Sequence, residues 1–239
     1  MIDISSNTDK YLENLDVVRL VSFPRTGSHW LRIMLELYLG APCAPQKFFE
    51  DSSNDKIWGF HIHNRKVYNP HPSEGPCVNL KKVLYLHRDP VDTIYSQLKY
   101  DKLIPTNWNG NIKEENIKIE KELFKIVYQY RDHLCRWRFF KEDIESYFEI
   151  TYEDLKENTY ESLVNIINWI DKDIEINKEK LNQIIEFSNK NTTKKVTPHD
   201  VHALNEEIIN NPYAYDSSRV VFKKLYSTVI SRFFIDLRG

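Results

Sequence analysis

Short apolar runs alternate with longer stretches of helical periodicity along most of this chain. Four of the runs read as buried strands: 17–21, 57–63, 82–87 and 147–151. Helical spacing of apolar residues is clearest in three segments: 113–145, 160–170 and 178–188. Strands separated by helices predict an α/β fold, a single three-layer domain with a central parallel sheet flanked by helices, and a ligand at the carboxyl ends of the strands.

The remaining stretches read as connections. Residues 1–16 are polar and acidic and are expected to form an N-terminal tail, which leaves 17–239 as the one domain. The segment 64–81 is rich in Pro, His and Asn and predicts an irregular loop near the mouth of the site. A second loop, or a lid, is expected at 101–111.

Composition narrows the possible partners. The chain has 239 residues and a formal net charge of −2, so no general attraction to nucleic acid or to an anionic membrane is expected. No signal peptide and no membrane span are predicted, and the oligomeric state is not indicated. Cys43, Cys77 and Cys135 lack metal-like spacing, and they read as free thiols of a reducing, cytoplasmic compartment.

The first strand leads into a polar turn and then a helix, which is the order that a phosphate-binding cradle needs. Arg25, Thr26, Gly27 and Ser28 form this turn. Backbone N–H groups and the helix N-terminus favour an anion there, and Arg25 stands where a cation could reach a leaving phosphate. The G-x-x-x-x-G-K-[ST] sequence is absent, which disfavours a standard ATPase or GTPase. The alternative is a plain strand-to-helix connection capped by Thr and Ser side chains.

A second candidate anion site follows the strand at 82–87. Arg88 comes directly after this strand, and Asp89 and Pro90 are a natural N-cap and first residue of the next helix. Ser96 lies about two turns into that helix, so Arg88 and Ser96 could bind one phosphate together. The alternative for Arg88 is a surface salt bridge to Asp89 or Asp92.

These segments resemble the motifs of sulfotransferases that use 3′-phosphoadenosine 5′-phosphosulfate (PAPS). Residues 23–30 are similar to the 5′-phosphosulfate loop of that family, and 84–90 with Ser96 to its 3′-phosphate site. Residues 150–158 resemble the Tyr-Glu-Asp stretch near the adenine. The resemblance covers about 17–195, contains the three motifs in the family's order, and implies a P-loop-like nucleotide site.

The resemblance assigns a role to each matching position. The 5′-phosphosulfate would be held by Arg25, Thr26, Gly27, Ser28 and His29. The adenine would contact Trp30 and Tyr152, and the 3′-phosphate would bind Arg88 and Ser96. Both aromatic residues have a structural alternative, since Trp30 could belong to the core and Tyr152 could simply end a strand.

The catalytic base is expected on the strand 57–63. The family has a Lys-x-His pair at this point, and the sequence here reads His61-Ile62-His63, so the resemblance makes His63 the base and puts His61 in the place of the lysine. An imidazole suits this task because its unperturbed pKa is about 6.5. A metal site made by both histidines with His199 and His202, or two structural histidines, are the alternatives. No obligatory metal is expected, because a sulfuryl group in transfer carries less negative charge than a phosphoryl group.

The C-terminal part departs from the family. The Arg-Lys-Gly-x-x-Gly-Asp-Trp stretch that closes over the nucleotide in cytosolic members is absent, and three residues could replace its charge: Lys194, Lys195 and Arg219. Residues 224–229 echo a dimerisation stretch, but Phe233 occupies its final acidic position. The resemblance implies sulfuryl transfer from PAPS to a hydroxyl or amine of an acceptor, a saccharide or a small molecule. A noncatalytic module that binds PAPS or its product 3′-phosphoadenosine 5′-phosphate (PAP), or a kinase-like nucleotide enzyme, are the competing interpretations.

Overall fold

A parallel sheet forms the centre of the protein. The computed structural model describes residues 18–39, 67–68, 82–105, 108–111, 113–191 and 217–237. The strands are β1 (Val18–Ser22), β2 (Val67–Tyr68), β3 (Lys82–His87) and β4 (Ser146–Thr151). Their order in the sheet is β2-β1-β3-β4, and each neighbouring pair is parallel. The predicted central parallel sheet is therefore confirmed.

The register gives the sheet two apolar faces. Leu84 of β3 is paired with Leu20 of β1 on one side and with Phe148 of β4 on the other. Because side chains alternate along a strand, Leu84 and Leu86 face one layer of helices while Val83 and Tyr85 face the other. A strand that is buried on both faces is typical of parallel sheets, and it explains why 82–87 reads as a continuous apolar run.

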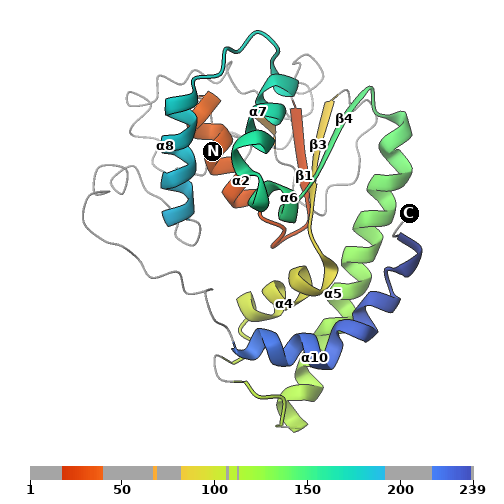
Figure 1. The fold of residues 1–239 in the computed structure, drawn as a ribbon. Helices are drawn as coiled ribbons and strands as arrows, with labels where there is room; N and C mark the ends of the chain where they lie inside the picture. Colours follow the sequence, from red (N-terminus) through yellow and green to blue (C-terminus); the bar gives the residue numbers. More distant parts are fainter. Residues whose placement is uncertain are drawn as a thin grey trace, which may run out of the picture.

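One face of the sheet is covered by four helices (Figure 1). They are α2 (Ser28–Leu39), α6 (Tyr152–Glu157), α7 (Thr159–Ile170) and α8 (Lys178–Asn191). Fully buried leucines and isoleucines of these helices pack on β1, β3 and β4: Leu31, Leu35, Leu155, Leu163, Ile166, Ile167 and Leu181. The predicted stripes of 160–170 and 178–188 are the faces that supply these residues.

The opposite face carries α5 (Lys113–Phe140), whose Trp137 packs on Val21, Val83 and Tyr85, while α4 (Pro90–Tyr100) lies beyond the carboxyl ends of the strands and packs against α5 and α10 (Ser217–Arg232) (Figure 1). Two short 3₁₀ turns, η3 (Lys141–Asp143) and η4 (Ile235–Leu237), follow α5 and α10. The second core lies between these helices and includes Ile94, Leu123, Tyr130 and Phe222. Helices on both faces of the sheet give the three layers expected from the sequence.

Two parts of the fold differ from the expectation. Residues Val67 and Tyr68, placed in a loop by the sequence, pair with Val18 and Arg19 of β1. The open edge of β1 offers unpaired backbone groups, and two β-forming residues are enough to extend the ladder. The helix α10 had no counterpart in the sequence prediction. The predicted tail 1–16 and the predicted strand 57–63 lie outside the described residues.

The topology predicts where a ligand would bind. The chain builds outward from β1 to β2 on one side, and then places β3 on the other side of β1. In parallel sheets, ligands bind at such a switch point, outside the carboxyl ends of the two strands. The turn after β1 and the link after β3 meet there, and these are the two segments that the sequence singled out.

Candidate functional site at the strand ends

The turn after β1 has the shape of an anion cradle. Arg25 and Gly27 have positive φ angles of 67° and 97°, and α2 begins at the next residue, Ser28. The N-terminus of this 12-residue helix therefore faces the carboxyl end of β1, where its partial positive charge favours an anion.

Thr26 contributes to the turn itself. Its side chain is fully buried, and its hydroxyl donates a 2.6 Å hydrogen bond to the carbonyl oxygen of Phe23. The backbone N–H of Thr26 approaches the same oxygen at 3.4 Å. In this arrangement Thr26 holds the turn closed, and its role toward a phosphosulfate stays a prediction.

Gly27 is required by its neighbour Tyr152. A Cβ atom at position 27 would lie 2.4 Å from Cδ2 of the Tyr152 ring, and a φ of 97° is one that other residues rarely adopt. The ring of Tyr152, at the start of α6, thus lies directly on the backbone of the turn. Its other contacts are the edge of Trp30, at a ring-centroid distance of 5.9 Å, and the guanidinium of Arg88, 4.4 Å from the ring centroid.

Arg88 connects the two candidate anion sites. It follows β3, and its Nη1 donates a 3.2 Å hydrogen bond to the carbonyl oxygen of Arg25. Its carboxylate partner is Glu153, with Nε 3.9 Å from Oε1, rather than Asp89 or Asp92. Asp89 instead caps α4 by accepting from the backbone N–H of Asp92 at 3.0 Å, as the sequence predicted.

Arg25 reaches across to α4. Its Nε donates a 3.3 Å hydrogen bond to Oγ of Ser96, 71 residues away in the chain. The exposed ring of Tyr100, one turn further along α4, lies under the guanidinium with its centroid 4.7 Å from Cζ. The structure therefore brings together Arg25, Arg88 and Ser96, three residues that the sequence analysis expected at one site.

Two further predicted residues lie at the start of α2. His29 keeps part of its surface exposed, and a partial loss of water around its imidazole, together with the charges of Arg32 and Arg25, lowers its pKa. His29 is consequently neutral near pH 7. Trp30 is buried, and its indole N–H donates to Oγ of Ser188 in α8 at 3.2 Å. Trp30 thus packs in the core, as its structural alternative proposed, with one edge on Tyr152; its contact with an adenine stays a prediction.

Several predicted residues cannot be placed. Both catalytic histidine candidates, His61 and His63, lie outside the described residues. Six other residues singled out in the sequence also lie outside the described residues: Cys43, Cys77, Lys194, Lys195, His199 and His202. Within the described ranges, no group of three His, Cys, Asp or Glu side chains could hold a metal ion, and no helix is long and apolar enough to cross a membrane.

Arg219 is paired with a carboxylate in the first turn of α4. It forms an ion pair with Asp92, with Nη2 2.8 Å from Oδ2, and Lys223 lies 2.9 Å from the other carboxylate oxygen. Burial alone would raise the pKa of Asp92, but the hydrogen bonds from Arg219 and Lys223 outweigh it and lower the pKa. These contacts attach α10 to α4, the helix that carries Ser96.

Sequence reasoning missed three residues that shape the site. Glu153 approaches Arg88 and accepts from the backbone N–H of Asp89 at 3.4 Å. Tyr100 supports Arg25, and Tyr130 of α5 hydrogen-bonds the backbone of Arg88. The only signal for Tyr130 was its place in the apolar stripe of the predicted helix, which indicates burial and says nothing of its hydroxyl.

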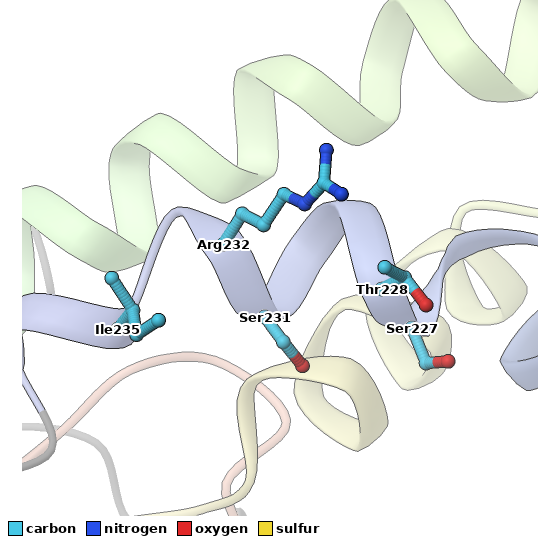
Figure 2. A pocket seen from close by; sticks show the side chains of 5 residues that line it. All are labelled: Ser227, Thr228, Ser231, Arg232 and Ile235. Carbon is cyan, nitrogen blue, oxygen red and sulfur yellow. The ribbon is translucent and has the colours of Figure 1, made fainter.

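A hollow of about 340 Å³ lies elsewhere, on α10 and η4 (Figure 2). Its lining consists of Ser227, Thr228, Ser231, Arg232 and Ile235. Figure 2 shows the Arg232 side chain extending toward α5 while Ser231 points toward α4. The polar groups diverge, and no residue of the strand-end site lines the hollow.

Comparison with known proteins finds a matching protein family and solved structures with a similar fold. The sulfotransferase domain matches residues 77–224. The fold is similar to that of a mouse sulfotransferase solved in complex with PAP, with 21% sequence identity and a TM-score of 0.58 over 94% of this chain and 85% of that one. Retinol dehydratase in complex with androsterone and the inactive cofactor PAP is similar at 12% identity and a TM-score of 0.54, over 92% of this chain and 80% of the other. Its complex with retinol and PAP gives 13% and 0.52 over the same shares.

Proposed function

The chain belongs to the sulfotransferase domain family, and we propose that it transfers a sulfuryl group from PAPS to a hydroxyl or amine of an acceptor. A saccharide or a small molecule is the proposed acceptor class. The solved structures with a similar fold contain PAP, the product that such a transfer leaves behind. The proposal for this chain rests on its own residues at the strand ends.

The observation that carries the proposal is the convergence of Arg25, Arg88 and Ser96 from three elements. Arg25 Nε lies 3.3 Å from Ser96 Oγ, and Arg88 Nη1 lies 3.2 Å from the Arg25 carbonyl oxygen. A 3′-phosphate distinguishes PAPS from ordinary adenine nucleotides, and an arginine with a hydroxyl is a suitable pair of donors for it.

The donors at this site also fit an anion. Arg88 Nε is buried and has no hydrogen-bond acceptor among the described residues, since the nearest carboxylate oxygen is 3.9 Å away on Glu153. A buried donor without an acceptor costs free energy, and a phosphate oxygen would satisfy it. The aromatic ring of Tyr152 under the guanidinium keeps Arg88 at the strand end.

In the proposed reaction, the chain supplies a base to the acceptor and positive charge to the departing 5′-phosphate. His63 accepts the proton of the acceptor hydroxyl or amine, whose oxygen or nitrogen forms a bond to sulfur as the bond from sulfur to the 5′-phosphate oxygen breaks. The electron pair of the broken bond goes to that phosphate oxygen. Arg25, Ser28 and the N-terminus of α2 stabilise the charge that develops there. Fixed donors suffice for a sulfuryl group, so we propose no obligatory metal.

Transfer of radiolabel from PAPS tests this function. The protein is incubated with labelled PAPS and a panel of saccharides, alcohols and amines, without added magnesium, and the products are separated by chromatography. We expect a labelled acceptor together with stoichiometric PAP. Tight binding of PAP without any labelled product would favour the noncatalytic module. Labelling from ATP with magnesium, and none from PAPS, would favour the kinase-like enzyme.

A further inference from the structure

One buried side chain outside the sequence motifs holds the backbone of Arg88. Arg88 comes after the last paired residue of β3, His87, and before the N-cap of α4, Asp89, so neither its N–H nor its C=O has a partner in the sheet. The phenol of Tyr130, 42 residues away in α5, forms hydrogen bonds with both backbone groups. The Arg88 N–H donates to Tyr130 Oη at 3.1 Å, and the Tyr130 hydroxyl donates to the Arg88 carbonyl oxygen at 2.7 Å.

The Tyr130 ring is held in place by packing. The side chain is fully buried and packs on Phe23, the first residue of the turn after β1, at a ring-centroid distance of 4.7 Å. Phe234 and His133 surround the ring at 5.8 Å and 6.4 Å. Burial raises the pKa of Tyr130 to about 12, so the hydroxyl stays protonated and able to donate throughout the neutral range.

We infer that Tyr130 is a positioning residue for the anion site, one that sets where the Arg88 guanidinium stands by clamping the Arg88 backbone. A tyrosine fits this task because its hydroxyl both donates and accepts. Phenylalanine would preserve the packing on Phe23 and lose both hydrogen bonds. The inference rests on the proposed function, which makes Arg88 a ligand of the 3′-phosphate.

Nucleotide binding by Tyr130→Phe tests the inference. Calorimetry compares PAP with 5′-AMP, which lacks the 3′-phosphate, for the native chain and for the variant. We expect the variant to lose about tenfold in affinity for PAP, because each net hydrogen bond is worth on the order of 1 kcal/mol. Its affinity for 5′-AMP should stay within about twofold of the native value, since 5′-AMP does not need Arg88.

A matched control separates positioning from general loss of stability. Tyr226→Phe removes another buried phenol, which approaches Glu120 at 3.4 Å in the same core and lies outside the site. It should lower the melting temperature without changing the preference for PAP. In an Arg88→Ala background, Tyr130→Phe should have no further effect on that preference, because the residue acts through Arg88.

The outcomes are distinguishable. A native chain that prefers PAP, with a Tyr130→Phe variant that keeps the full preference, overturns the inference and leaves the proposed function standing. Equal losses for PAP and 5′-AMP in the variant also overturn it, since they indicate a structural role alone. A native chain with equal affinity for both ligands overturns the proposed function and the inference together.

Discussion

Catalysis at the residue scale depends on the histidine assigned as the base. His63→Ala should reduce sulfuryl transfer by about 10²- to 10⁴-fold, the usual contribution of general-base catalysis, while PAP binding stays near the native value. His61→Ala should cost less. Labelled-PAPS kinetics and PAP calorimetry on both variants check this prediction. An inactive His61 variant with an active His63 variant would exchange the two roles.

The turn after β1 tolerates no side chain at Gly27. Gly27→Ala would place a Cβ atom 2.4 Å from the Tyr152 ring at a φ of 97°. We expect a loss of about 1–3 kcal/mol in the free energy of unfolding, from the strained φ and the displaced ring. PAP affinity should also fall, because Tyr152 supports Arg88. Thermal denaturation and calorimetry measure the two effects.

Gly110 offers a matched control for this change. It also has a positive φ, of 80°, and an added Cβ would meet Val221 and Leu225 of α10, away from the strand ends. Gly110→Ala should therefore lower the melting temperature and leave PAP affinity unchanged. If both variants keep native PAP affinity, the packing of Tyr152 on the turn has no part in nucleotide binding.

At the scale of elements, α5 is attached to the sheet through an aromatic cluster that contains a buried histidine. His133 of α5 lies between Phe23, Tyr85 and Trp137, at centroid distances of 5.6, 5.8 and 6.4 Å. Burial, reinforced by the charge of Arg136, lowers the pKa of His133 to about 4. The native protein thus holds this imidazole neutral, whereas the unfolded chain protonates it near pH 6.5.

The pH dependence of stability follows from this difference. Between pH 6.5 and about 4 the unfolded chain binds the proton and the native protein does not, so stability falls as the pH is lowered through that window. The loss attributable to His133 amounts to at most about 3 kcal/mol, at 1.36 kcal/mol per pKa unit. Urea denaturation at several pH values measures the free energy of unfolding as a function of pH. Its decrease between pH 6.5 and about 4 should be smaller in His133→Phe than in the native chain. The same decrease in the variant and the native chain would assign the pH dependence of stability to other groups.

Local sequence patterns correctly predicted one strand and the start of the helix that follows it. The strand 82–87, the Asp89 cap and Pro90 at the start of α4 follow from a short apolar run and cap chemistry, and all are observed. The helix α10 escaped prediction because apolar residues lie on several of its sides. Phe222, Tyr226 and Ile230 are buried, but Val220, Leu225 and Val229 are exposed, so no single stripe stands out.

The site was predictable only in part, for a similar reason. Arg25 and Arg88 could be identified because each follows a strand that the sequence marks, and Ser96 because it lies about two turns into the helix that begins at Pro90. The contact of Tyr130 with Arg88 spans 42 residues, and that of Arg25 with Ser96 spans 71. Such pairings depend on how α4 and α5 pack in the folded protein, which no local pattern contains.

Among the described residues, one core packs between the sheet and α2, and another lies among α4, α5 and α10; the candidate site touches both. Trp30 and Tyr152 belong to the core on the α2 side, while Phe23 and Tyr130 belong to the core on the α5 side. Arg88 contacts members of both groups through Tyr152 and Tyr130. A ligand bound at Arg88 should therefore stabilise the domain as one unit rather than a single layer.

This coupling predicts a ligand-dependent melting temperature. At a PAP concentration of about 100 times its Kd, the free energy of unfolding should rise by about 2.7 kcal/mol, without added magnesium. The same concentration of 5′-AMP should give a smaller rise, and Arg88→Ala should lose most of the difference between the two ligands. Asp92→Asn, which weakens the attachment of α10 through Arg219 and Lys223, should lower the starting melting temperature yet keep the full PAP increment. A scan that shows two transitions, of which PAP shifts only one, would mean that the two cores unfold separately and that the site belongs to one of them.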